Sequence, residues 1–227
     1  MPFSDLPARL AEVRERIDAA VRRGGHDQRV TLIAVTKTHG ADAVEAAWRA
    51  GVRDVGENRV QEALAKMQEV DVPVRWHLIG HLQRNKVRHL EPFALLHSLD
   101  SARLADAVNA YGLQRGRAVD ALLQVNVAGE ASKGGYAPGV VRAEAERLAA
   151  CAGVRLCGVM TMAPFDAPEH VLRATFAGAR AARDTLREAG HPAELLSMGM
   201  SDDFEIAIEE GATHVRLGTI LFGARAP

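Results

Sequence analysis

The sequence has few cysteines and no long hydrophobic run. Only Cys151 and Cys157 are cysteines among 227 residues, and they form neither a Cys-x-x-Cys motif nor a Cys/His cluster. This argues against a zinc site and against a disulfide-stabilised secreted domain. No apolar run approaches the roughly 18 residues of a membrane span, and the N-terminus lacks a signal-peptide pattern. A reduced, cytoplasmic protein without a membrane partner is therefore expected.

An excess of charge of one sign is also lacking. The 28 Lys and Arg residues are balanced by 29 Asp and Glu residues, which gives a formal net charge of −1. A nucleic-acid surface is therefore not expected. One small basic cluster, Arg84, Lys86 and Arg88, is typical of a solvated helix face, although a second phosphate or a partner protein would also fit it.

Aromatic residues make up only 4% of the chain, whereas 48% of its residues are hydrophobic. Ala, Val, Leu and Ile must therefore build the core. The length is unusual for one ordinary domain but normal for one α/β barrel. No Pro/Gly/Ser-rich linker or break in composition divides the chain, so a single domain, 1–227, is predicted.

Strand and helix patterns alternate along the chain. An apolar stripe from Leu6 to Val21 predicts a first helix, and Gly24-Gly25 ends it. Short apolar and β-branched runs then predict eight strands, separated by helical patterns. The predicted strands cover 31–37, 52–56, 74–79, 94–98, 120–127, 155–160, 194–198 and 213–217, and the predicted helices cover 4–23, 41–50, 57–69, 84–90, 101–114, 138–151, 168–189 and 202–210.

Eight strand–helix repeats favour a closed, parallel (β/α)8 barrel of the TIM type with an extra N-terminal helix. An open, doubly wound sheet fits less well, because no G-x-G-x-x-G motif follows the first strand. A barrel places its functional site at the carboxyl ends of the strands. The polar residues that follow each predicted strand are therefore the candidate site residues.

Lys37 comes directly after the apolar run 31–36. Burial of an ammonium group is unfavourable unless the group is paired or loses its proton. A neutral lysine amine attacks carbonyl groups and forms Schiff bases. Alternatively, the side chain extends from the strand end into water. Other groups at the same end of the barrel must decide between these two interpretations.

Glycine-containing segments follow the last two predicted strands. Residues 197–201 (Ser-Met-Gly-Met-Ser) open a helix, and Gly218-Thr219 follows strand eight. Their backbone N–H groups and hydroxyls can hold an anion, and barrels frequently bind phosphate in these two loops. Each segment alone is also compatible with an ordinary turn and a capping serine.

A Schiff-base lysine opposite a phosphate loop suggests pyridoxal 5′-phosphate (PLP). Strand one adjoins strand eight in a closed barrel, so Arg216 would approach the pyridine nitrogen. A charged Arg at that position opposes protonation of the nitrogen and weakens the ring as an electron sink. An ion pair of Arg216 with Glu57 or Asp202 is the alternative.

Six segments resemble the YggS/PROSC family of pyridoxal phosphate homeostasis proteins. They occur in family order over nearly the whole chain, and the Trp-His-x-Ile-Gly-x-x-Gln block is the family signature. Thr38-His39-Gly40 stands where many members have a proline, and we expect only a loop adjustment there. The segments are 34–39, 56–59, 76–86, 158–162, 197–202 and 215–219.

The resemblance implies a fold-type III barrel similar to the N-terminal domain of alanine racemase, and it implies roles for nine residues. Lys37 would carry PLP as an aldimine, and Arg216 would face the ring nitrogen. Ser201, Gly218 and Thr219 would hold the phosphate. The other implied pocket residues are Asn58, Met198, Gly199 and Met200.

The implied function is a carrier or buffer of PLP in vitamin B6 homeostasis, acting as a monomer and without efficient turnover. PLP-dependent apo-enzymes would be its acceptors. Racemases of this fold type carry a second, β-rich domain with a catalytic tyrosine, and the chain length leaves no room for one. Tyr136, in the Gly-rich loop after strand five, is the candidate substitute, whereas Tyr111 falls in a helical stripe.

Two enzymatic alternatives remain open, an amino-acid racemase and a sugar-phosphate enzyme that uses Lys37 as aldolases do. Lys133 could cover the site or receive the cofactor in transit, although a solvated loop lysine is the simpler interpretation. His77 and His81 are four residues apart. A third metal ligand is not evident near them, so no metal site is predicted.

Overall fold

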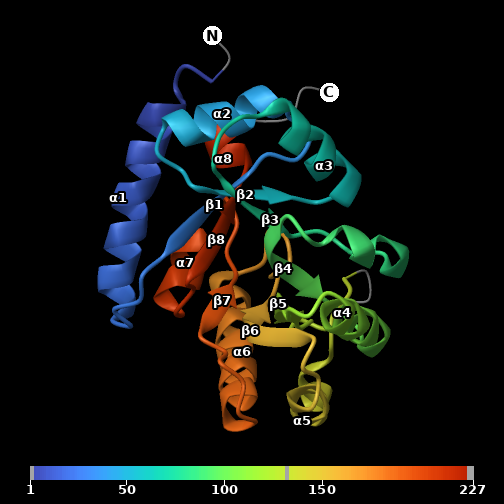
Figure 1. Cartoon of the computed structure of the whole chain (residues 1–227). Coiled ribbons are helices and arrows are strands. Elements are labelled where there is room, and N and C mark those ends of the chain that lie inside the picture. The colour runs from blue at the N-terminus through green and yellow to red at the C-terminus, as the bar shows by residue number, and fades with distance from the viewer. Residues whose placement is uncertain (1–2, 131–132, 224–227) are drawn as a thin grey trace.

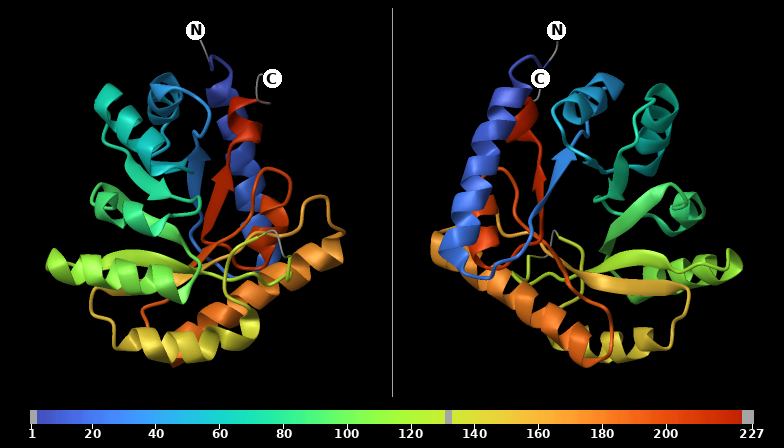
Figure 2. Two further views of the ribbon diagram at one scale, coloured as in Figure 1. Left: turned by 90° about the vertical axis from the view of Figure 1, so that its right-hand side faces the viewer. Right: turned by 60° about the vertical axis from the view of Figure 1, so that its left-hand side comes forward.

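The computed structural model describes residues 3–130 and 133–223, in which eight parallel strands close into a barrel (Figures 1 and 2). The predicted domain 1–227 also includes 1–2, 131–132 and 224–227, outside the described ranges. The strands are β1 (Thr31–Val35), β2 (Asp54–Glu57), β3 (Arg75–Leu78), β4 (Phe93–Leu99), β5 (Val119–Gln124), β6 (Val154–Met160), β7 (Leu195–Ser197) and β8 (His214–Leu217). The helices are α1 (Leu6–Gly24), α2 (Ala41–Arg49), α3 (Val60–Glu69), α4 (Ala102–Gln114), α5 (Val141–Ala149), α6 (Glu169–Glu188), α7 (Phe204–Glu209) and α8 (Thr219–Phe222), with 3-10 helices η1 (Arg84–His89) and η2 (Pro138–Val140).

Each strand pairs with the next one in sequence, and β8 pairs with β1. Ile33 lies opposite Arg216 in this closing pair, and β1 and β8 run side by side in Figure 2. The predicted barrel and the additional N-terminal helix are thereby confirmed. The closure places the segments after β1, β7 and β8 around one opening.

Several element boundaries differ from the predicted ones. Glu57 ends β2 instead of opening a helix, and α3 begins after Arg59, whose backbone is extended. Residues 84–89 form a 3-10 helix. β5 ends at Gln124 because the chain beyond it turns to pair with the loop, where the Asn126 N–H donates to the Tyr136 carbonyl at 2.9 Å. β1 ends at Val35, two residues before Lys37.

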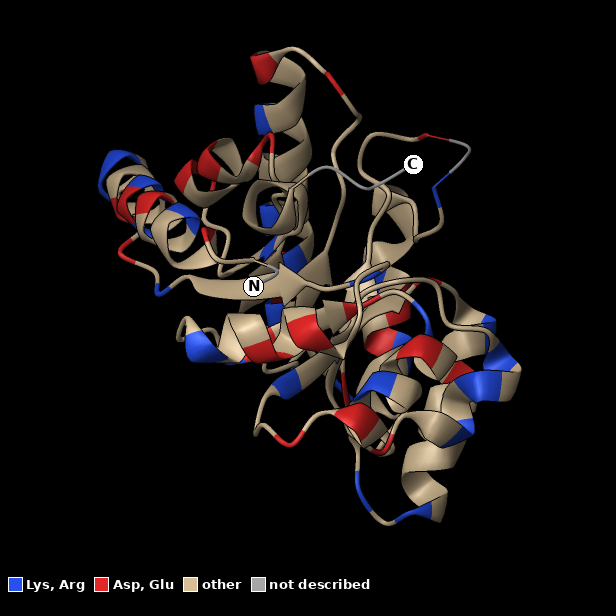
Figure 3. Cartoon of the chain, turned by 90° about the horizontal axis from the view of Figure 1, so that it is seen from above, with Lys and Arg blue, Asp and Glu red and all other residues tan. Residues whose placement is uncertain are grey.

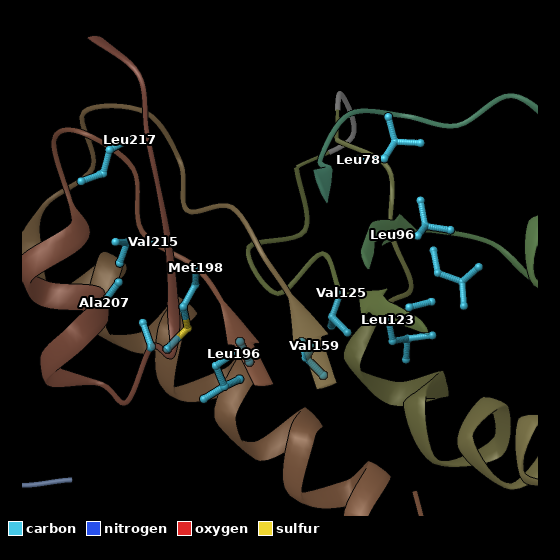
Figure 4. Packing of buried hydrophobic residues seen from close by; sticks show 14 of the residues in the cluster. Leu78, Leu96, Leu123, Val125, Val159, Leu196, Met198, Ala207, Val215 and Leu217 are labelled. Carbon is cyan, nitrogen blue, oxygen red and sulfur yellow. The ribbon is translucent and has the colours of Figure 1, made fainter. Parts of the chain in front are cut away.

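Most of the apolar core lies between the strands and the helices that surround them. Figure 4 shows part of this layer, in which Leu196 and Met198 lie near Val215 and Ala207. A smaller apolar cluster of Leu95, Leu122 and Met160 is separate from it. Because side chains alternate along a strand, the residues between the outward-facing ones point into the barrel.

Helix α1 packs beside α7 (Figure 1). The Arg16 guanidinium lies 2.7 Å from the Glu205 carboxylate, and Arg23 lies 2.5 Å from Glu209. Lys and Arg alternate with Asp and Glu over the peripheral helices (Figure 3). Within the described ranges, no helix combines the length and the apolar character needed to cross a membrane.

Candidate functional site

A cavity of about 640 Å³ opens at the carboxyl ends of the strands. This volume falls within the range of small-molecule sites, about 300–1,000 Å³. Residues from segments far apart in the sequence line it, as the barrel topology predicts. Seven of the nine residues that the resemblance implied are among them: Lys37, Asn58, Met200, Ser201, Arg216, Gly218 and Thr219.

Lys37 lies in the turn that follows β1, and its side chain lines the cavity. Thr38 takes a left-handed conformation, with φ +70°. This is uncommon for a residue with a β-branched side chain, and it costs conformational energy that the surrounding contacts must offset. The turn therefore has a defined shape that directs Lys37 to the cavity.

A buried ion pair supports this turn from behind. Lys66 Nζ lies 2.6 Å from Glu57 Oε1 and donates to the Thr36 carbonyl at 2.7 Å. The Thr36 hydroxyl donates to the same Glu57 oxygen at 2.5 Å. These bonds connect α3 and the end of β2 with the residue directly before Lys37. Glu57 is thus paired with Lys66, not with Arg216.

Lys66 was not singled out from the sequence. It shares the buried face of α3 with Val60 and Ala63, at the helical spacing of three residues. A lysine on the apolar face of a helix was the signal that could have identified it. The identity of its partner depends on the barrel, because the partner lies on β2.

Arg216 points into the barrel, where only 5% of its surface is exposed. Its guanidinium donates to the Ser197 hydroxyl at 2.7 Å and to the Thr161 carbonyl at 2.9 Å. Burial lowers the pKa of Arg216 to about 10, against the attraction of Asp203. The group therefore remains a cation at neutral pH, held by two neutral acceptors.

Ser197 links this arginine to a buried histidine, His97. His97 was not considered from the sequence, but it lies on the inward face of β4, and burial lowers its pKa well below the ordinary value. His77 contacts His97 and the Asp54 carboxylate. Burial also lowers the pKa of the neighbouring His214 to about 4. The interior below the cavity thus contains several buried polar side chains.

Asp54 Oδ1 accepts a hydrogen bond from His77, and both carboxylate oxygens are bound by Arg75. Despite the opposing effect of burial, the hydrogen bonds of His77 and Arg75 lower the pKa of Asp54 from 3.8 to about 2. A depressed folded-state pKa stabilises the protein above the unfolded-state pKa. This stabilisation is lost as pH falls from about 4 to 2.

We expect Asp54→Asn to lower the free energy of unfolding at pH 7 by about 2 kcal/mol. The difference from the parent should shrink as pH falls toward 3, because the Asp54 carboxylate of the unfolded parent is then protonated while that of the folded parent is still ionised. Urea denaturation at both pH values measures it. Asp106→Asn, at an exposed ion pair with Arg147, is the control and should change stability little. An equal loss at both pH values would contradict the assignment.

The loops after β7 and β8 meet at one end of the cavity. Ser201 Oγ accepts a hydrogen bond from the Ile220 backbone at 3.3 Å, so the two loops are joined. The Met200 N–H donates to the Asp203 carboxylate at 2.6 Å. Ser201, Gly218 and Thr219 line the cavity here, beside the exposed carboxylate of Asp202.

Met198 and Gly199 do not line the cavity. Met198 follows the inward-facing Ser197 and therefore points outward, where it is fully buried near Ala207 and Val215 (Figure 4). Gly199 has φ +93°, and a Cβ there would lie 2.7 Å from the Ala207 Cβ. The Gly199 carbonyl accepts a hydrogen bond from the Arg216 backbone at 2.9 Å. These two residues support the site from outside the barrel.

Asn58 follows β2 and faces the end of β3. A Cβ on Gly80 would lie 2.3 Å from the Asn58 carbonyl, so only glycine allows the two segments to approach so closely. Gly80 and Ile79 line the cavity beside Asn58. The glycine in the Ile-Gly motif therefore positions one wall of the cavity.

Lys133 and Phe165 lie at the mouth of the cavity. Lys133 Nζ donates to the Ala163 carbonyl at 2.8 Å and lies 2.6 Å from Glu130. It therefore connects the loops after β5 and β6 instead of extending into solvent. Asp100, on the same cavity, accepts a hydrogen bond from His81 at 2.7 Å. His81 and His77 thus have separate partners.

Tyr136 is buried outside the cavity. Its hydroxyl donates to Glu144 at 2.7 Å, and both burial and this bond raise its pKa. Glu144 also binds Arg147, so its charge stays paired without the tyrosine. The hydroxyl is therefore not placed to exchange protons with a molecule in the cavity.

We expect Tyr136→Phe to lower the free energy of unfolding by about 1 kcal/mol, the usual net value of one hydrogen bond. Ligand binding in the cavity should be unchanged, because Tyr136 does not reach it. Denaturation curves and a PLP titration followed by absorbance would test both expectations. A strong loss of binding or of any amino-acid turnover would assign Tyr136 to the site.

The sequence matches the family model of the alanine racemase N-terminal domain over residues 9–226. It is also 43% identical over 226 residues to the pyridoxal phosphate homeostasis protein of Pseudomonas aeruginosa. That match covers 98% of this chain and 97% of the relative. The resemblance inferred from the six sequence segments is thereby confirmed.

Solved structures agree with this relationship. PipY of Synechococcus elongatus, determined with PLP bound, is 38% identical and has a TM-score of 0.85 over 96% of this chain and 100% of PipY. Alanine racemase from Corynebacterium glutamicum is 13% identical, with a TM-score of 0.73 over 99% of this chain. The alignment covers only 62% of the racemase, and at this identity it shows a shared fold alone.

Proposed function

The chain belongs to the alanine racemase N-terminal domain family and, within it, to the pyridoxal phosphate homeostasis proteins, and on this premise we propose that it binds PLP covalently through Lys37. The cavity residues carry this proposal. An amine, a buried cation and a pair of loops with hydroxyl groups surround one space of about 640 Å³. They match the aldehyde, the ring nitrogen and the phosphate of the cofactor.

The chemistry of the lining residues fits the cofactor. Lys37 supplies the primary amine that a carbonyl requires. Ser201 and Thr219 supply hydroxyls, and Gly218 supplies a backbone segment without a side chain directly before the short helix α8. The loops after strands seven and eight with a short extra helix are the usual phosphate site of barrels. Asn58 would contact the ring from the side of β2.

Arg216 decides what kind of chemistry the site supports. PLP supplies an electron sink when its ring nitrogen is protonated. The Arg216 guanidinium is held in the interior by Ser197 and Thr161 and keeps its positive charge at neutral pH. A cation at the ring nitrogen disfavours a second positive charge there. The site thus favours holding the cofactor over activating it.

We propose on this basis a carrier or buffer of PLP in vitamin B6 homeostasis, without efficient turnover. PLP-dependent apo-enzymes would be the acceptors, and the protein would act in the cytoplasm as a monomer with one domain, 1–227. Tyr136 supports the absence of racemisation, because its hydroxyl is occupied by Glu144 outside the cavity.

The test is a titration of the purified protein with PLP, followed by borohydride reduction and mass spectrometry of the digested protein. We expect a visible absorption band with PLP and, after reduction, one modified peptide that contains Lys37. A racemisation assay with a panel of amino acids should give little turnover. Sustained turnover would favour the racemase alternative. The absence of a band, with borohydride trapping of a sugar phosphate instead, would favour the aldolase-like alternative.

A further inference from the structure

A continuous chain of buried polar side chains crosses the barrel interior below the cavity. Asp54, His77, His97, Ser197 and Arg216 come from five strands, and none is more than 5% exposed. Successive polar atoms along this order are 2.9, 2.9, 2.8 and 2.7 Å apart. All four distances are those of normal hydrogen bonds. The chain connects the N-terminal end of the barrel with the arginine of the cavity.

The two ends of this chain determine its hydrogen-bond directions. A guanidinium only donates, so Ser197 Oγ accepts from Arg216. The ionised Asp54 carboxylate only accepts, so His77 Nε2 carries a proton. If both histidines are neutral, His77 Nδ1 accepts from His97 Nε2, and His97 Nδ1 accepts the Ser197 hydroxyl proton. Every donor then points toward Asp54.

One additional proton on His77 reverses the direction of the hydrogen bonds between His77 and His97 and between His97 and Ser197. His77 Nδ1 then donates to His97 Nε2, and His97, which burial keeps neutral, carries its own proton on Nδ1. That nitrogen now donates to Ser197 Oγ, so Ser197 accepts from both His97 and Arg216. The Ser197 hydroxyl proton must turn away from His97. The Ser197 hydroxyl that accepts from Arg216 therefore reorients when His77 gains a proton.

We propose that Asp54, His77, His97 and Ser197 form a relay that positions the Arg216 guanidinium and couples its orientation to the protonation state of His77. The proposal rests on the proposed function in one respect, namely that PLP is the molecule whose ring Arg216 faces. The four residues are positioning residues, because they act on the ligand through Arg216.

The charged and titratable groups around His77 come from several strands. The Asp54 carboxylate on β2 is hydrogen-bonded to His77, and Arg75 binds the same carboxylate. The ring centroids of His97 and His214 lie 5.2 and 6.3 Å from that of His77. Ser197 is hydrogen-bonded to both His97 and Arg216 and so lies between them. Burial lowers the pKa of both neighbouring histidines, and His77 is the member of this group that is hydrogen-bonded to a carboxylate.

The relay can be tested without PLP, by nitrogen-15 NMR of the histidine rings over about pH 5 to 9. We expect the His97 proton to lie on Nε2 at high pH and to move to Nδ1 with the same midpoint at which His77 gains its proton. A His97 tautomer that stays constant while His77 titrates would overturn the relay. A His77 that does not titrate over this range would overturn the coupling as well.

The effect on the ligand is tested by the absorbance of the PLP-loaded protein as a function of pH. The parent should show a spectral shift with the His77 midpoint, and Ser197→Ala should lose it. Thr175→Val is the matched control, because the buried Thr175 hydroxyl donates only within α6, to the Val171 carbonyl at 2.8 Å. His77→Gln, at the far end of the relay, should also lose the pH-dependent spectral shift. This variant replaces Ser197→Ala in the experiment if Ser197→Ala does not fold.

The outcomes separate the two proposals. If the parent binds PLP but Ser197→Ala and His77→Gln keep the pH-dependent shift, the relay is wrong and the proposed function stands. If the parent shows no PLP band, the proposed function fails, and the NMR result alone decides whether the relay exists.

Discussion

Lys37→Ala should abolish the borohydride-stable attachment of PLP. Lys37 lines the same cavity as Ser201 and Thr219, and its amine is the group that a cofactor aldehyde would react with. Without the amine, Arg216 and the hydroxyls of Ser201 and Thr219 remain in the cavity, so weaker, non-covalent binding should persist. Absorbance with and without borohydride, followed by mass spectrometry, measures the loss.

Lys133→Ala is the matched control for this experiment. Lys133 lines the same cavity, but its ammonium is bound to the Ala163 carbonyl and to Glu130. The control should therefore keep the covalent link at Lys37. Loss of the adduct in Lys133→Ala, with its retention in Lys37→Ala, would move the attachment site to Lys133 and contradict the assignment.

Lys66→Met should cause the largest loss of stability. It leaves the Glu57 carboxylate without its cation in an environment where the glutamate side chain is 0% exposed. Removal of one partner of a buried ion pair typically costs about 3–5 kcal/mol. Glu57 Oε2 already has no hydrogen-bond partner among the described residues, so the remaining charge would be poorly compensated. The denaturation midpoint measures the effect.

Two further variants show whether the loss comes from the unpaired charge. The double variant Glu57→Met/Lys66→Met should recover much of the stability, because both charges are then absent. Arg59→Ala breaks the exposed pair with Glu62 and should cost at most about 1 kcal/mol. If the single and double variants at Glu57 and Lys66 were equally unstable, packing rather than charge would be responsible.

The same pair should also affect the cofactor site. Lys66 Nζ donates to the Thr36 carbonyl, directly before Lys37. In the folded fraction of Lys66→Met, we therefore expect slower formation of the covalent PLP adduct than in the parent. Stopped-flow absorbance after mixing with PLP measures this rate.

Much of the fold was predictable from the sequence, because its signals are local. Apolar runs and helical periodicity identified eight strand–helix repeats, and that number with that order favours a closed barrel. The cavity residues after β1, β7 and β8 followed from the same rule, since polar residues at the carboxyl ends of barrel strands share one opening. Lys37, Ser201, Arg216 and Thr219 were identified in this way.

The tertiary structure decided which side chains meet inside the barrel. His97 and Ser197 are 100 positions apart and on strands that are not neighbours, yet their polar atoms are 2.8 Å apart. Side chains alternate along β7, so Ser197 points inward and Met198 points outward. Because most residues of this segment are apolar, the local sequence pattern cannot establish which of them face the barrel interior. Lys66 likewise finds Glu57 only when α3 packs on β2. Barrel closure makes these contacts, so they depend on strand register and tilt rather than on any short stretch of sequence.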